Sequence, residues 1–139
     1  MKKMEIVNLG VTQYELFRLN YLEAVASGEQ EAIHQMRVAL KKFYALKKFL
    51  LHGMGPLGAA VVKNHLEPLR MVYKAAGKVR DLQVIRDVTI NTAGLQAPES
   101  FSDYLDSLQQ SRLEKFLAIS NTVELPTQRD IAQSLNKYV

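Results

Sequence analysis

The stretch HQMRVALKKFYALKKFLLH, residues 34–52, decides the fold class of this chain. Its apolar residues recur at spacings of three and four, as in Met36, Leu40, Phe43 and Leu46. This spacing places them on one face of a helix and does not fit the two-residue alternation of a half-buried strand. Lysine and arginine residues stand between the apolar ones without breaking the pattern. The stretch therefore predicts an amphipathic helix with a basic side.

The same helical spacing runs through the rest of the chain between clear break signals. Clusters of Gly, Pro, Asn and Ser place these breaks at residues 27–30, 52–58, 75–81, 91–100 and 121–127. The expected helices cover residues 11–26, 29–51, 57–76 with a short restart over 81–90, 100–120 and 127–138. No segment alternates β-branched and polar residues over a useful length. We therefore expect an all-α protein, an antiparallel helical bundle of about five helices that forms one domain over residues 1–139.

Two features predict interruptions within the third of these segments. Pro68 lacks a backbone N–H, so it should kink the helix or mark a joint between two shorter ones. Gly77 fits a C-terminal cap, after which Asp81 would cap the restarting helix and orient Arg80 through an ion pair.

The composition is that of a globular protein with a modest positive charge. Of its 139 residues, 47% are hydrophobic, and the formal net charge is +4. The chain contains no cysteine, which excludes disulfides and thiolate metal sites. No leader pattern and no apolar run of about 18 residues is present. We expect a soluble, cytoplasmic protein without a membrane partner, whose charge favours an anionic ligand.

The basic residues of the 34–52 stretch are arranged as one stripe. At about 100° per residue, His34, Arg37, Lys41, Tyr44 and Lys48 fall within an arc of about 80° that borders the apolar side. Like charges at these spacings repel, and no Asp or Glu occurs between Glu31 and Glu67 to relieve them. This uncompensated charge indicates that an external anion neutralises it.

The next segment carries a second basic stripe. Lys63, Arg70 and Lys74 share one helical face, and Lys78 and Arg80 follow it. If the two helices pack antiparallel, the two stripes flank one groove, in which arginine forks would bind phosphate in a bidentate manner and lysines as point charges.

These two segments, EAIHQMRVALKKFYALKKFL and LRMVYKAAGKVRDLQV, resemble the CHAD domain, the conserved histidine α-helical domain. Its hallmark is a His-x-x-Arg helix followed one helix later by a Gly-x-x-Arg-Asp turn, matched here by His34, Arg37, Gly77, Arg80 and Asp81. The resemblance covers residues 31–88. It implies an all-helical fold of two related bundles around a pseudo-two-fold axis, with a basic central groove that binds inorganic polyphosphate.

The chain departs from this family in size. A complete domain of this kind is substantially longer and shows the basic helix twice, whereas this chain shows it once and resembles a half-domain. Either it is part of a longer domain, or it pairs with itself so that a true two-fold axis replaces the pseudo-two-fold axis. We expect the homodimer.

The basic stripes predict an anionic ligand, and the resemblance implies that this ligand is polyphosphate, so we expect a polyphosphate-binding module. The predicted binding residues are His34, Arg37, Lys41, Lys48, Arg70, Lys74, Lys78 and Arg80. Two alternatives stay open: a nonspecific nucleic-acid-binding protein, and a structural or interaction bundle without a polyanion ligand. The stripe offers few aromatic stacking platforms for bases, which counts against nucleic acid.

An enzyme is not predicted. The chain has no glycine-rich phosphate loop, no cysteine nucleophile and no His-Glu-x-x-His pair, so we expect no catalytic residue, metal or cofactor. The acidic cluster Glu99, Asp103 and Asp106 lies early in its predicted helix, where carboxylates favour the helix N-terminus.

Overall fold

The computed structural model describes residues 3–52, 56–93 and 99–138, and these form five helices and no strand. The helices are α1 Lys3–Ser27, α2 Gln30–His52, α3 Pro56–Ala93, α4 Glu99–Thr122 and α5 Gln128–Tyr138. The predicted all-α class is confirmed over this part of the chain. None of the described helices is long and apolar enough to cross a membrane.

Most of the predicted breaks separate helices, and the first of them shows why. Gly28 has a φ of +64°, in the left-handed region that favours glycine, and its N–H bonds the Ala24 carbonyl at 2.8 Å. One residue later, the Glu29 N–H donates to the Ser27 hydroxyl at 3.1 Å. The chain thereby leaves α1 and enters α2 within a few residues, which favours an antiparallel pair.

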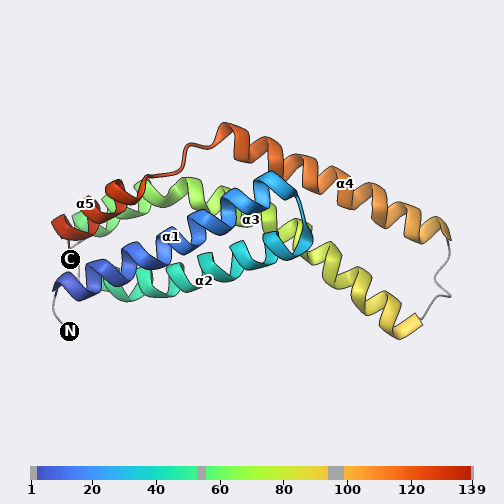
Figure 1. Cartoon of the computed structure of the whole chain (residues 1–139), viewed down its shortest axis with the longest axis horizontal. Helices are drawn as coiled ribbons and strands as arrows, with labels where there is room; N and C mark the ends of the chain where they lie inside the picture. Colours follow the sequence, from blue (N-terminus) through green and yellow to red (C-terminus); the bar gives the residue numbers. More distant parts are fainter. Residues whose placement is uncertain (1–2, 53–55, 94–98, 139) are drawn as a thin grey trace.

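The predicted break at residues 75–81 is wrong. α3 continues from Pro56 to Ala93, with Pro68, Gly77 and Asp81 all inside it. Gly77 is therefore not a C-terminal cap, and Asp81 does not cap a helix. A glycine inside a helix costs only about 1 kcal/mol, which tertiary packing readily offsets. Pro68 does not end the helix either, and Figure 1 shows that α3 bends between its two halves.

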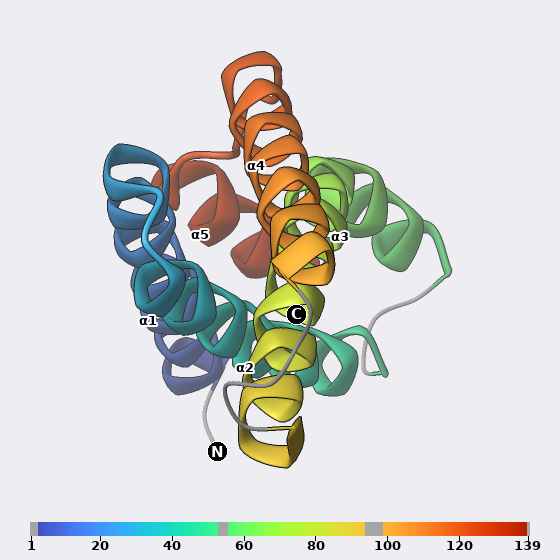
Figure 2. The same cartoon turned by 90° about the vertical axis from the view of Figure 1, so that its right-hand side faces the viewer.

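The helices divide into a bundle and a projecting hairpin (Figures 1 and 2). α1 packs against α2 and α5, and α3 packs against α2 and α5, so the first half of α3 belongs to the bundle. After Val79, its last residue in the bundle core, α3 leaves the bundle and pairs with α4. The beginning of α1 and the end of α5 lie at the same end of the molecule (Figure 1).

The hairpin is held by charged side chains as well as apolar ones. Leu82 and Leu105 are buried between α3 and α4, and the Arg86 guanidinium pairs with the Asp106 carboxylate. Asp106 thus has a partner on α3, which corrects the prediction that this acid serves the N-terminus of its own helix. Glu99 does lie in the first turn of α4.

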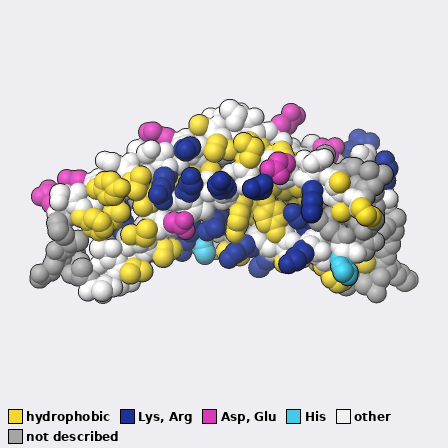
Figure 3. All heavy atoms as spheres, turned by 180° about the vertical axis from the view of Figure 1, so that it is seen from behind, with side chains coloured by type: hydrophobic (Ala, Val, Ile, Leu, Met, Phe, Trp, Pro, Cys, Tyr) yellow, Lys and Arg dark blue, Asp and Glu magenta, His cyan; other side chains and the backbone are white. Residues whose placement is uncertain are grey.

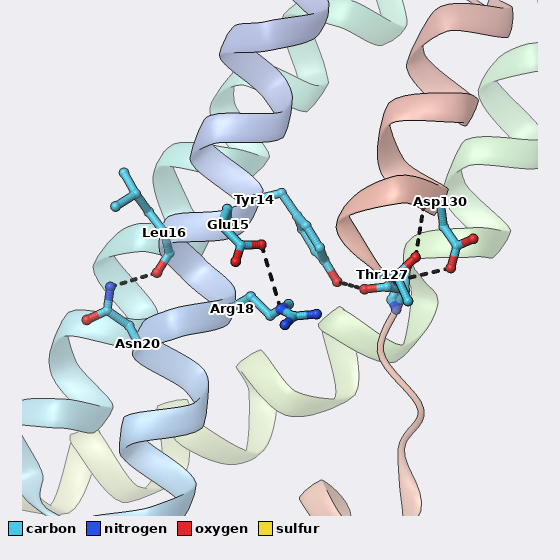
Figure 4. Close-up of polar contacts among 8 residues, drawn as sticks. Tyr14, Glu15, Leu16, Arg18, Asn20, Thr127 and Asp130 are labelled. Carbon is cyan, nitrogen blue, oxygen red and sulfur yellow. Dashed lines mark hydrogen bonds and ion pairs between the residues drawn. The ribbon is translucent and has the colours of Figure 1, made fainter.

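Aromatic rings of α1 and α2 form the centre of the bundle core. Tyr14 is fully buried, and its ring lies 5.9 Å from that of Phe17 and 5.4 Å from that of Phe43, between ring centroids. Its hydroxyl donates to the backbone carbonyl of Pro126, just before α5 (Figure 4). This hydrogen bond fixes the α4–α5 connection on α1.

The N-terminus of α5 has its own reciprocal cap. The Asp130 N–H donates to the Thr127 hydroxyl at 3.1 Å, and the Thr127 N–H donates to the Asp130 carboxylate at 3.0 Å (Figure 4). This capping box satisfies two N–H groups that a helix start otherwise leaves unbonded.

Replacing Tyr14 by Phe should lower the free energy of unfolding by about 1–3 kcal/mol, because the Pro126 carbonyl loses its buried donor. The substitution should also make the free energy of unfolding less dependent on pH above about pH 10. Burial raises the pKa of Tyr14, so the unfolded chain ionises first and stability is lost as pH rises. Urea unfolding at neutral and alkaline pH measures both effects. Unchanged stability at neutral pH would show that this hydrogen bond contributes nothing.

Candidate functional site

The basic stripe of α2 lies beside the core, as predicted. Ile33, Met36, Leu40 and Phe43 are buried on one side of the helix. The stripe residues are graded in exposure: His34, Arg37 and Tyr44 are half-buried, and Lys41 and Lys48 are exposed. The stripe thus combines side chains held by packing with charges that reach solvent.

α2 and α3 pack antiparallel at this stripe, which brings the two sequence motifs together. Arg37 contacts Tyr73 and Gly77, and further along α2 the Tyr44 ring meets the Tyr73 ring edge-on at 5.6 Å between centroids. One turn before Arg37, the same register places His34 opposite the turn that carries Arg80. We call the predicted binding residues on these two helices the basic face.

Gly77 provides the space in which Arg37 lies. A Cβ atom built at Gly77 would stand 3.4 Å from Arg37 Nη2 and 3.7 Å from Arg37 Cζ. The guanidinium therefore rests directly against the α3 backbone. The glycine in the Gly-x-x-Arg-Asp motif has this role here, in place of the predicted helix cap.

The guanidinium of Arg37 is positioned without an acidic partner. Its Cζ lies 4.9 Å from the centroid of the Tyr73 ring, a cation–π distance. No ion pair or hydrogen bond joins it to another described residue, and its buried Nε has no hydrogen-bond partner. Arg37 is thus held in place by an aromatic ring and by backbone, and its outer N–H donors remain available to an anion.

Arg80 is oriented differently from the prediction. Its Nη1 donates to Oε1 of Gln83 at 3.2 Å, and Gln83 is only 1% exposed. Asp81 points to solvent, and no ion pair joins it to Arg80 in the part of the chain described by the structure. One helical turn, from residue 80 to residue 83, brings the amide to Arg80, whereas the adjacent Asp81 projects from another face of α3.

A lysine lies over the ring of Tyr44, which stands beside the basic face. Lys47 Nζ lies 4.5 Å from the Tyr44 ring centroid, so this lysine runs along the apolar edge of the helix. Burial, and next the charge of Lys63, lower the pKa of Lys47. Burial raises the pKa of Tyr44 to about 12, and its buried hydroxyl has no hydrogen-bond partner. Tyr44 is therefore a wall at the edge of the core.

The remaining predicted residues of α3 are exposed. Arg70 donates to Glu67 at 3.4 Å, an exposed pair that contributes little to stability and leaves Arg70 partly neutralised. Lys74 and Lys78 form no ion pair with any described residue. Figure 3 shows the combined result: Lys and Arg side chains gather across the middle of the face opposite to that of Figure 1, with hydrophobic side chains between them.

Sequence reasoning missed Tyr73 and the cations of α4. Tyr73 precedes Gly77 by one helical turn, a signal that could have paired it with Arg37. Arg112 Nη1 donates to the Lys78 carbonyl at 2.9 Å, and Lys115 lies one turn further along α4. The sequence does not mark these cations as part of a basic surface, because Glu114 precedes Lys115 and balances its charge locally.

A metal site finds no support in the described side chains. No group of three or more His, Asp or Glu residues among them has an arrangement that could hold a metal ion.

One of the comparisons with known proteins assigns a family to the chain. Neither curated proteins nor solved structures give a match to the chain. The family model of the CHAD domain matches residues 13–139, a wider span than the sequence motifs alone cover. The chain, with its His-x-x-Arg helix packed onto the Gly-x-x-Arg segment of α3, belongs to the CHAD-domain family.

Proposed function

We propose that the chain is a binding module for linear inorganic polyphosphate, which lies on the basic face. The observation that carries this proposal is the Arg37 guanidinium, held against Tyr73 and Gly77 with no acidic partner among the described residues. The ligand contacts come from both helices: His34, Arg37, Lys41 and Lys48 of α2, and Arg70, Lys74, Lys78 and Arg80 of α3.

A linear polyphosphate suits this arrangement for electrostatic reasons. Its charges are regularly spaced and its chain is flexible, so lysines at helical intervals can follow it without a fixed geometry. Arginine adds bidentate contacts to phosphate oxygens. Release of counterions from the polyanion supplies much of the binding free energy, as it does for nucleic-acid backbones. Membership in the CHAD-domain family supports the same ligand class.

Nucleic acid is the second candidate, and the aromatic side chains argue against it. Sequence-tolerant binding of single strands uses open aromatic faces on which bases stack. Here Arg37 lies over the Tyr73 ring and Lys47 over the Tyr44 ring. Both rings thereby already have a cation as a neighbour, and each presents less free surface to a base.

We propose binding and not catalysis. The basic face contains donors and point charges, whereas phosphoryl chemistry needs positioned carboxylates or an activated nucleophile. Three acids lie nearest to it in sequence. Glu31 accepts a hydrogen bond from Gln35, Glu67 pairs with Arg70, and Asp81 points to solvent. A cytoplasmic location stays a prediction.

The double variant Arg37→Ala/Lys41→Ala should bind long-chain polyphosphate more weakly than the wild type. The dependence of its binding constant on salt concentration should correspond to about two fewer released counterions, because two phosphate contacts are lost. Titration calorimetry at several salt concentrations, with duplex DNA and single-stranded RNA as competitors, measures both effects. Lys42→Ala is the matched control, since Lys42 is an exposed lysine of α2 outside the stripe.

Retained affinity in the double variant, with helicity intact by circular dichroism, would refute this location for the site. Equal competition by nucleic acid would show a nonspecific polyanion surface, and absence of polyphosphate binding by the wild type would refute the function.

Replacing Gly77 by Leu should weaken polyphosphate binding without any change of charge. The side chain would occupy the space of the Arg37 guanidinium and push it off the α3 backbone. Gly77→Ala is the matched control: its Cβ stands at an ordinary contact distance, and the better helix propensity of alanine should add up to about 1 kcal/mol to the free energy of unfolding. If Gly77→Leu binds as well as Gly77→Ala, the position of Arg37 is unimportant for the ligand.

A second copy of the chain is the partner that we propose for the projecting hairpin. Val84 and Val88 lie on the same face of α3 as Gly77 and Arg80, further along the helix, in the part that projects from the bundle. Val88 is 57% exposed. Tyr104 of α4 is 61% exposed at the same end of the hairpin. Pairing of two hairpins would cover these apolar side chains and join two basic faces around one axis.

Replacing Val88 by Glu should therefore lower the mass in solution from that of a dimer to that of a monomer while the fold is kept. Light scattering after gel filtration gives the mass. Phe49→Glu is the control, because Phe49 is 69% exposed on α2, away from the hairpin. A monomeric wild type, or a dimer that survives Val88→Glu, would contradict this pairing.

A further inference from the structure

A cleft between α3 and α4 is lined by three lysines. Its volume is about 260 Å3, and its lining residues are Met71, Lys74, Ala75, Lys78, Lys115 and Ile119. Met71, Ala75 and Ile119 supply an apolar floor on which the lysine stems can lie. The three lysines thus line a hollow between two helices.

None of the described side chains that line this cleft is acidic. The acid next to Lys115 in sequence, Glu114, accepts a hydrogen bond from Gln110 at 3.1 Å, along its own helix. On α3, Asp81 follows Lys78 by three residues, and no ion pair joins the two within the described structure. Three like charges around one hollow repel each other, and an anion placed among them would relieve this repulsion.

Arg112 holds the two walls of the cleft together. Its Nη1 donates to the backbone carbonyl of Lys78 at 2.9 Å, which attaches α4 to α3 at this turn. Lys115 follows Arg112 by about one helical turn and is therefore kept on the same side as Lys78. The position of Lys115 is thus set by a tertiary contact.

The cleft adjoins the basic face because Lys74 and Lys78 belong to both. On α3, Tyr73 and Gly77 face α2, while Met71 and Ala75 face α4. Lys74 and Lys78 project between these two sides of the helix. A polyanion that lies against Arg37 can therefore cross α3 at Lys74 and Lys78 and continue into the cleft.

We propose that this cleft is a second contact site for the same polyanion and that Lys115 of α4 binds phosphate groups of chains long enough to extend there from the α2–α3 face. This inference rests on the proposed function. It assigns a ligand contact to α4, a helix outside the two motif segments. It also gives the protein a preference for long chains over short ones, since a short chain cannot occupy both places at once.

Titration of Lys115→Ala with long-chain polyphosphate and with tripolyphosphate tests the proposal. Long-chain binding should weaken several-fold relative to the control Lys42→Ala, with a salt dependence lower by about one released counterion. Tripolyphosphate should bind both variants equally, because it occupies only the face around Arg37. Both lysines are exposed, so neither variant should disturb the fold.

Lysine acetylation followed by mass spectrometry gives a second readout on the wild-type protein. Long-chain polyphosphate should protect Lys115, whereas tripolyphosphate should leave it reactive, and Lys42 should react in both cases. The proposal is overturned if Lys115→Ala and Lys42→Ala bind long chains equally, or if Lys115→Ala loses affinity for both ligands alike. These outcomes concern α4 alone; only a wild type that binds no polyphosphate would defeat the proposed function as well.

Discussion

The contact of the Arg37 guanidinium with α3 is the constraint on which the rest of this structure depends. The positive group lies against the Tyr73 ring and the backbone at Gly77, so it is partly removed from water without an acidic partner among the described residues. A cation–π contact compensates such a charge by only about 0.5–2 kcal/mol. Close packing of buried residues of α2 and α3 must therefore stabilise the place where the two helices cross. The incomplete compensation supports the proposed contact between Arg37 and an anion.

This contact also explains why α3 is one continuous helix. A break at Gly77 would move the backbone on which Arg37 rests and would separate Arg80 from Gln83, which is its hydrogen-bond acceptor one turn later. Continuity carries α3 out of the bundle and gives α4 a surface to pack on (Figure 1). The projecting hairpin is thus a consequence of the same helix that builds the basic face. The pairing of α4 with α3 is also why Lys115 can line a cleft with Lys74 and Lys78.

Stability and charge are carried by different parts of the bundle. Tyr14 fixes the α4–α5 connection to α1 through the Pro126 carbonyl and lies among buried aromatic rings. The charges of α2 and α3 stand at the edge of this core, where their stems are packed and their ends reach solvent. Because the polar anchor of the bundle is a tyrosine on α1, exposed lysines such as Lys41 and Lys74 can be changed without loss of the core. This separation allows the protein to fold while it carries a surface rich in lysine and arginine (Figure 3), whose mutual repulsion costs stability.

The sequence by itself determined the helical class, most helix ends, and the stripe of His34, Arg37, Lys41 and Lys48, because these depend on spacing along one helix and on local turn chemistry. It could not determine what happens at Gly77, since a glycine has the same local preference whether it ends a helix or leaves room for a neighbour. Only the packing of α2 on α3 decided that Arg37 fills this space and that Gln83, instead of Asp81, orients Arg80. Likewise, the contact of Arg112 with α3 places Lys115 beside Lys74 and Lys78. These residues lie far apart in sequence, and helical periodicity does not predict which distant residues tertiary packing brings together.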